Sequence, residues 1–146
     1  MQAGALGIME IRMEHTDGLG RPAEVWVDGV LLTVCDGISE PGRPVGPGEL
    51  TNVKLQYVSQ QGYSLADYRA DNDGKRKELD PVRRWTYVGY GQIVSIMPVV
   101  VDFGTVQMED ANWTSDESMV GQYVAVPIDR LEIVPANQPD WPEDMR

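Results

Sequence analysis

The sequence predicts a mainly β fold built around a small barrel of bent strands, with an N-terminal hairpin and one short helix. Three stretches point to this class. Residues 23–37 place two apolar runs on either side of an Asp-Gly turn, and residues 51–59 alternate apolar with polar side chains. Residues 89–109 carry apolar side chains on both faces and are interrupted by glycine. Bent strands of this kind are what a small closed barrel requires.

The length and composition are those of one globular domain. The chain has 146 residues, of which 42% are hydrophobic. No apolar run approaches the ~20 residues that span a bilayer, and the first residues lack the positive charge of a signal peptide. Cys35 is the only cysteine, so no internal disulfide can form. We therefore expect a cytoplasmic protein without a membrane span, with one domain over 1–134 and an acidic, proline-rich tail over 135–146.

The N-terminal hairpin is the strongest local signal. Asp28 and Gly29 suit a two-residue type I′ turn, because both of its central positions take positive φ. The next segment, residues 38–50, contains three prolines and three glycines and is predicted to be a loop. The turn predicts the cross-strand pairs Val27–Val30, Trp26–Leu31 and Val25–Leu32, with Val25, Val27, Val30, Leu32 and Val34 on one face.

A strand over residues 51–59 leads into a predicted loop with a short helix, residues 60–84. Ser64 suits a helix N-cap, and Asp67 follows three residues later, near the positive end of the helix dipole. The turn-forming run Asn72-Asp73-Gly74 would end this helix.

Glycine 104 is predicted to mark a bulge in a bent strand. Val99, Val101 and Phe103 share one face, but strict alternation would next place polar residues on that face. A bulge at Gly104 shifts the phase by one residue, so that Val106 and Met108 also face inward. Residues 85–134 would then supply the strands of the barrel.

The last apolar segment is predicted to be interrupted by one turn. Val124, Val126 and Ile128 share one face, and we expect Asp129-Arg130 to turn the chain before the final apolar residues. In the tail, Trp141 is either a docking anchor or packs back on its own domain.

Residues 89–134 resemble an SH3-like small barrel. The pattern is "YGQIVSI", a turn, "VVVDFG", a loop, and then "YVAVPIDRLEIV". An OB-type barrel is the alternative, because it also uses a bent, glycine-marked strand and an inserted helix. The resemblance implies a domain that binds peptides, nucleic acids or protein subunits, and it assigns no functional residue.

Catalytic and metal-binding patterns are weak. Cys35 and His15 are the only candidates for a thiol–imidazole pair, but Cys35 continues an apolar strand. An EF-hand register through Asp71–Gly74 would place arginine and lysine at ligand positions, which opposes calcium. No phosphate-loop, dinucleotide or nucleophile-elbow motif is present. We therefore expect no metal, no cofactor and no catalysis, with a carboxylate-based hydrolase as a remote alternative.

Charge patterning singles out one segment. The formal net charge of -11 argues against generic binding of nucleic acid. A local group of cations is either an exposed basic loop or a contact surface, and the neighbouring aromatic residues either stack on a ligand or pack in the core. The candidate contact residues are Lys75, Arg76, Lys77, Arg83, Arg84, Trp85 and Tyr87.

The function predicted from these observations is non-catalytic binding of a protein partner, including a second copy of the chain. The first alternative is a barrel that binds an oligonucleotide or an oligosaccharide through Trp85, Tyr87 and Arg83.

Overall fold

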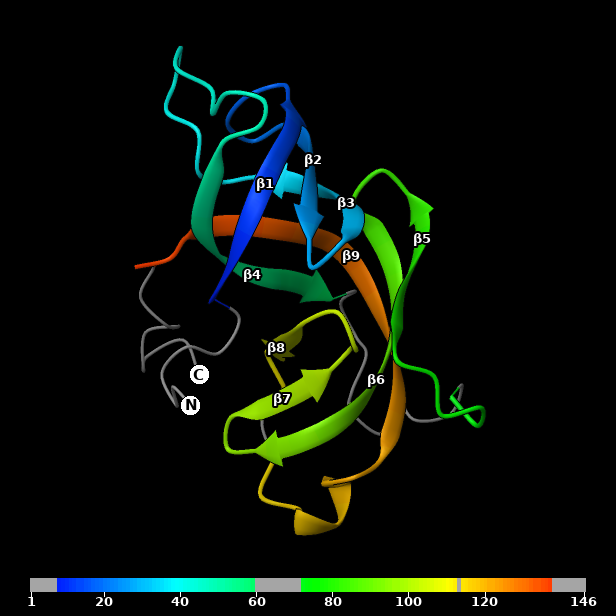
Figure 1. Cartoon of the computed structure of the whole chain (residues 1–146). Coiled ribbons are helices and arrows are strands. Elements are labelled where there is room, and N and C mark those ends of the chain that lie inside the picture. The colour runs from blue at the N-terminus through cyan, green and yellow to red at the C-terminus, as the bar shows by residue number, and fades with distance from the viewer. Residues whose placement is uncertain (1–7, 60–71, 113, 138–146) are drawn as a thin grey trace.

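The computed structural model describes residues 8–59, 72–112 and 114–137, and these residues form a mainly β structure (Figure 1). The strands are β1 (Ile8–Thr16), β2 (Pro22–Val27), β3 (Val30–Asp36), β4 (Leu50–Ser59), β5 (Glu78–Arg83), β6 (Thr86–Ile96), β7 (Val99–Asp102), β8 (Gln107–Glu109) and β9 (Tyr123–Pro135), and a short 3-10 helix, η3, spans Glu117–Met119. The helix predicted to start at Ser64 lies outside the described residues.

Five strands close into a small barrel, as the sequence predicted. β1 pairs with β2 on one side and with β4 on the other, and β2 continues to β3. β4 pairs with the second half of β9. A short parallel contact between β3 and β9, with Cys35 opposite Glu132 and Asp36 opposite Ile133, completes the ring.

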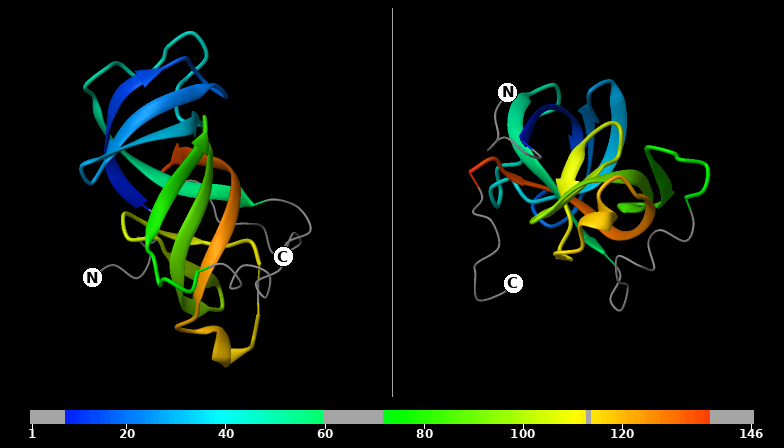
Figure 2. Two further views of the ribbon diagram at one scale, coloured as in Figure 1. Left: turned by 90° about the vertical axis from the view of Figure 1, so that its right-hand side faces the viewer. Right: turned by 90° about the horizontal axis from the view of Figure 1, so that it is seen from below.

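The same hydrogen-bonded sheet continues beyond the barrel through β9, and we call this outer part the second sheet. The first half of β9 pairs with β6, which also pairs with β5 and β7, and β7 pairs with β8. In the left view of Figure 2 the barrel lies above this second sheet, and β9 runs through both. The strands of 85–134 therefore contribute only β9 to the closed ring, and the N-terminal strands supply the rest.

The hairpin over residues 23–37 forms as predicted. Val25 pairs with Leu32, Trp26 with Leu31, and Val27 with Val30. Asp28 and Gly29 take φ values of 49° and 80°, which fit the predicted turn. Val30 departs from the prediction of a buried face: it is 42% exposed beside the turn, where the strands end.

One continuous hydrophobic core lies under both sheets. Phe103 is fully buried, and its ring meets that of Tyr57 edge to face at 5.8 Å. Two glycines of β6 make room for it: a Cβ at Gly89 would lie 2.6 Å from the Phe103 ring, and one at Gly91 would lie 2.7 Å from Val101. These two glycines within β6 thus let its backbone lie against the core aromatic ring.

Gly104 lies in a hairpin turn, so the predicted bulge is wrong. The predicted burial of Val106 and Met108 is nevertheless correct. Gly104 has a φ of 88° and lies between β7 and β8, which pair antiparallel. The Phe103 amide donates to the Val106 carbonyl at 2.9 Å and closes the turn. Val106 and Met108 are buried, as the shifted phase required.

The predicted turn at Asp129-Arg130 is also wrong, because β9 continues through it. Val58 of β4 lies opposite Arg130, whereas the next residue, Ser59, lies opposite Ile128. Asp129 is therefore the extra residue of a bulge. The bulge shifts the phase, so that residues before and after it face the core while Asp129 and Arg130 are both exposed.

Two strands were missed in the sequence. β1 was not predicted, and β5 lies in a stretch expected to be a loop. Among the described strands β5 pairs only with β6, and Pro81 and charged side chains blunt its other edge. Over the described ranges, the structure holds no helix long and apolar enough to cross a bilayer.

Candidate functional site

The hairpin turn between β5 and β6 places Arg84 and Trp85 beside the bulge of β9. Arg83 pairs with Thr86, and Arg84 takes a positive φ of 46° in the turn between them. Two hydrogen bonds fasten the turn to β9. The Leu131 amide donates to the Trp85 carbonyl at 2.9 Å, and the Thr86 hydroxyl donates to the carbonyl of the bulged Asp129 at 3.0 Å.

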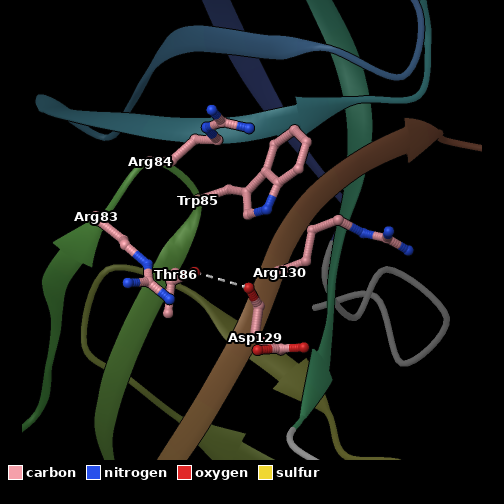
Figure 3. A pocket seen from close by; sticks show the side chains of 6 residues that line it. All are labelled: Arg83, Arg84, Trp85, Thr86, Asp129 and Arg130. Carbon is pink, nitrogen blue, oxygen red and sulfur yellow. Dashed lines mark hydrogen bonds between the residues drawn. The ribbon is translucent and has the colours of Figure 1, made fainter.

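These segments enclose an open pocket of about 590 Å³, which we call the arginine–tryptophan pocket. In Figure 3, Arg84 and Trp85 extend toward β3, while Asp129 and Arg130 project from β9. The pocket size falls in the range of ~300–1,000 Å³ that is common for ligand sites. Its lining residues are Arg83, Arg84, Trp85, Thr86, Asp129 and Arg130.

The pocket is cationic. Its described lining includes three arginines and a single carboxylate. Arg130 donates from Nε to Glu132 at 3.0 Å, and the Arg84 guanidinium lies 5.6 Å from the centre of the Trp85 ring. Within the described chain, Arg83 and Arg84 have no carboxylate partner. Guanidinium groups that have no carboxylate partner are suited to bidentate binding of a carboxylate or a phosphate.

Tyr87 lies in the core and does not line the pocket. It is 3% exposed, and its hydroxyl accepts from the Thr33 amide and donates to the Thr33 carbonyl, each at 2.9 Å. Burial raises the pKa of the Tyr87 phenol. This side chain fastens β6 to the open edge of β3, which is the core role that the sequence left as an alternative.

The basic loop lies at the other end of β5 from the pocket. β5 has six residues and separates the two by roughly 17–20 Å. Arg76 pairs with Glu78 and lies 4.0 Å from the Tyr90 ring centre, while Lys77 pairs with Asp102 at 3.1 Å. Lys75 lies 5.9 Å from the ring centre of Tyr123. Two of the three cations are therefore neutralised locally.

Asn72 holds this basic loop on the second sheet. Its side-chain amide is buried and donates to the Val124 carbonyl at 3.0 Å and to the Arg76 carbonyl at 3.1 Å. Its carbonyl oxygen accepts from the Arg76 amide at 2.9 Å. Turn chemistry thus accounts for the Asn-Asp-Gly run in the described part of that segment.

Sequence reasoning found half of the pocket and missed the other half. Arg83, Arg84 and Trp85 were candidates, but Thr86, Asp129 and Arg130 were not. The sequence held one signal for the missing pair. The alternation of apolar residues along the last strand shifts by one residue between Ile128 and Leu131. A bulge explains this shift as well as a turn does.

The thiol and the imidazole of the chain are held apart. His15 lies on β1 opposite Glu24, and its ring bonds to Asp17 at 2.9 Å. Cys35 lies on β3, two strand spacings or about 10 Å across the sheet and two residues further along the strand. Burial raises the pKa of the Cys35 thiol, which disfavours the nucleophilic thiolate. In the described parts of the chain, no three His, Cys, Asp or Glu side chains form a group that could hold a metal ion.

No family model, curated protein or solved structure matches the chain.

Proposed function

We propose that the chain is a non-catalytic binding domain that associates with protein, including further copies of itself, through the arginine–tryptophan pocket. The observation that carries this proposal is the pair Arg83 and Arg84, which lack a carboxylate partner in the described structure. The Arg84 guanidinium also lies 5.6 Å from the ring centre of the partly exposed Trp85. Arginine and tryptophan are the side chains most enriched at the energetic centres of protein interfaces.

The charge of the chain supports an acidic protein surface as the partner. The net charge is -11, so the cationic pocket contrasts with the rest of the molecule. A second copy therefore offers the pocket an abundance of carboxylates, and complementary charges speed association and fix its orientation. A cytoplasmic location belongs to the same proposal.

The barrel itself favours a second candidate, the binding of an oligonucleotide or an oligosaccharide. The ring joins β1, β2, β3, β9 and β4 in that order and closes through the parallel contact of β3 with β9. This order supports the OB-like form over the SH3-like form, and OB-type barrels bind such ligands. The net charge opposes a polyanion, and we therefore rank this candidate second. The hydrolase alternative gains no support, since the residues described around the pocket offer one carboxylate where an acid and a base need two.

Light scattering after size exclusion, over a concentration series, tests the proposal. We expect the mass of the wild type to rise with concentration in low salt and to fall in high salt, because the contact is ionic. The variant Arg83→Gln/Arg84→Asn should shift this rise to at least about tenfold higher concentration, as expected for ~1.4 kcal/mol of lost contact. Asparagine tolerates the positive φ at position 84, so the turn is preserved.

The matched control is Arg12→Gln/Arg21→Gln, which removes the same charge from exposed positions outside the pocket. Arg12 also lies over a tryptophan, 5.5 Å from the ring centre of Trp26, so it reproduces the local chemistry of Arg84. This control should associate like the wild type. A monomeric mass at every concentration in low salt would refute self-association.

A further inference from the structure

We propose that the pocket receives residues 138–146 of a second copy of the chain. This inference rests on the proposed function and names the segment that the pocket binds. The segment has the sequence QPDWPEDMR and lies outside the described residues. It is inferred from three properties: its charge, its aromatic and proline content, and the direction of the strand that precedes it.

Charge is the first property. The segment carries Asp140, Glu143 and Asp144 against one arginine, a net charge of -2. The lining of the pocket carries three arginines against Asp129, a net charge of +2. Paired arginine and carboxylate groups form charge-assisted, often bidentate hydrogen bonds. Arg83 and Arg84 have no such partner within the described residues, and the segment supplies more than one.

The side chains between those carboxylates match the apolar part of the pocket. Trp141 stands between two prolines, and a proline-flanked aromatic residue is a common anchor in aromatic-lined grooves. The Trp85 indole is the aromatic surface of the pocket, and Arg84 lies beside it. A pocket of about 590 Å³ admits a few side chains of an extended segment.

The direction of β9 favours a second copy as the donor. Arg130 lies in the middle of β9, and the strand continues for five residues, or about 17 Å, to Pro135. In Figure 1 the end of β9 lies across the barrel from the turn between β5 and β6. To fill its own pocket, the segment would have to double back around the barrel. Reciprocal exchange between two copies would instead close a symmetric dimer.

The first experiment neutralises the segment in the full chain and leaves its length unchanged. We expect Asp140→Asn/Glu143→Gln/Asp144→Asn to shift self-association to at least about tenfold higher concentration by light scattering. The charge-matched control is Glu24→Gln/Asp28→Asn/Glu117→Gln, which changes three exposed carboxylates on β2, its turn and η3. The control should associate at least as well as the wild type, because it weakens only general repulsion.

The second experiment measures the contact directly. A fluorescent peptide of residues 138–146 is titrated with the segment-neutralised protein, and its anisotropy is recorded. We expect saturable binding that weakens at least about tenfold when Arg83→Gln/Arg84→Asn is added, and no binding of a peptide with asparagine and glutamine at the three acidic positions. A labelled oligothymidylate of similar length is the rival ligand.

The outcomes separate this inference from the proposed function. If the segment-neutralised chain still associates while the pocket variant does not, the pocket binds another acidic surface: the inference is wrong and the proposed function stands. If the wild type is monomeric although the peptide binds, the segment fills its own pocket and the second copy is excluded. If the pocket binds only the oligothymidylate, the inference and the preferred function are both overturned in favour of the nucleic-acid alternative.

Discussion

Asp36 shows how a single buried carboxylate can organise a barrel end. It is fully buried at the end of β3, where it and Cys35 form the parallel contact with β9 that closes the ring. It accepts hydrogen bonds from the hydroxyl groups of Thr16 and Ser39 and from the amides of Ile38 and Ser39. Burial alone would raise the pKa of Asp36, but these four bonds outweigh burial and hold the pKa below its ordinary value.

This pKa shift makes a prediction about stability and pH. Because the folded pKa is lower than the unfolded one, Asp36 stabilises the fold above pH ~4, and this contribution is lost as the pH falls through the folded value. Asp36→Asn should lower the free energy of unfolding at pH 7 by about 1–3 kcal/mol, since buried donors lose a charged acceptor. It should also reduce the dependence of stability on pH below 4.

Urea denaturation of both proteins between pH 7 and pH 3 measures the two effects. The control is Asp73→Asn, which alters an exposed aspartate in a turn and should leave the stability within about 0.5 kcal/mol of the wild type. Equal losses in the two variants, or an unchanged pH dependence in Asp36→Asn, would contradict the role assigned to Asp36.

At the scale of elements, local chemistry was visible in the sequence and long-range pairing was not. The hairpin around Asp28-Gly29 was predicted down to its residue pairs, because two adjacent residues determine the turn and its register. The strand β4 was also predicted, from its alternation of apolar and polar residues, but without its partner strands. In contrast, β1 has few of these signals, and its pairing with β2 and β4 depends on residues far along the chain.

The pocket was only half predictable for the same reason. Arg83, Arg84 and Trp85 are adjacent in the sequence, so charge and aromatic content revealed them together. Asp129 and Arg130 join them through a bulge that exists only where β4 pairs with β9. A break in the alternation of apolar residues shows that the backbone of that strand is irregular at this point. Whether the irregularity is a turn or a bulge depends on the pairing with the neighbouring strand.

The turn that carries Arg84 makes a prediction at this scale. A side chain at a φ of 46° is strained, and a β-branched residue is strained most. Arg84→Val should therefore lower the free energy of unfolding by about 1–2 kcal/mol, whereas Arg84→Gly should leave it within about 1 kcal/mol of the wild type. Denaturant titration distinguishes these results. Equal stabilities of the two variants would mean that the turn relaxes without cost, and the pocket would then lack a rigid wall.

At the scale of the whole molecule, β9 and the shared core join the barrel and the second sheet. β9 pairs with β3 and β4 in one half and with β6 in the other, and the buried side chains of both sheets form one cluster. The two parts therefore lack the separate cores that would let them unfold independently. The arginine–tryptophan pocket lies at this junction, so its geometry depends on both.

A single cooperative unfolding transition is the resulting prediction. Ile133→Ala in the barrel half of β9 and Ile93→Ala in β6 each remove a fully buried side chain and should each cost about 2–5 kcal/mol. Native-state hydrogen exchange should show each variant lowering the protection of the β2 amides and the β7 amides by the same amount, because both strands open only in global unfolding. Val94→Ala is the control, since Val94 is 40% exposed on β6 and should change neither set. If Ile93→Ala lowered the protection of β7 alone, the second sheet would be a separate unit, and a ligand bound in the pocket would then stabilise one part of the molecule more than the other.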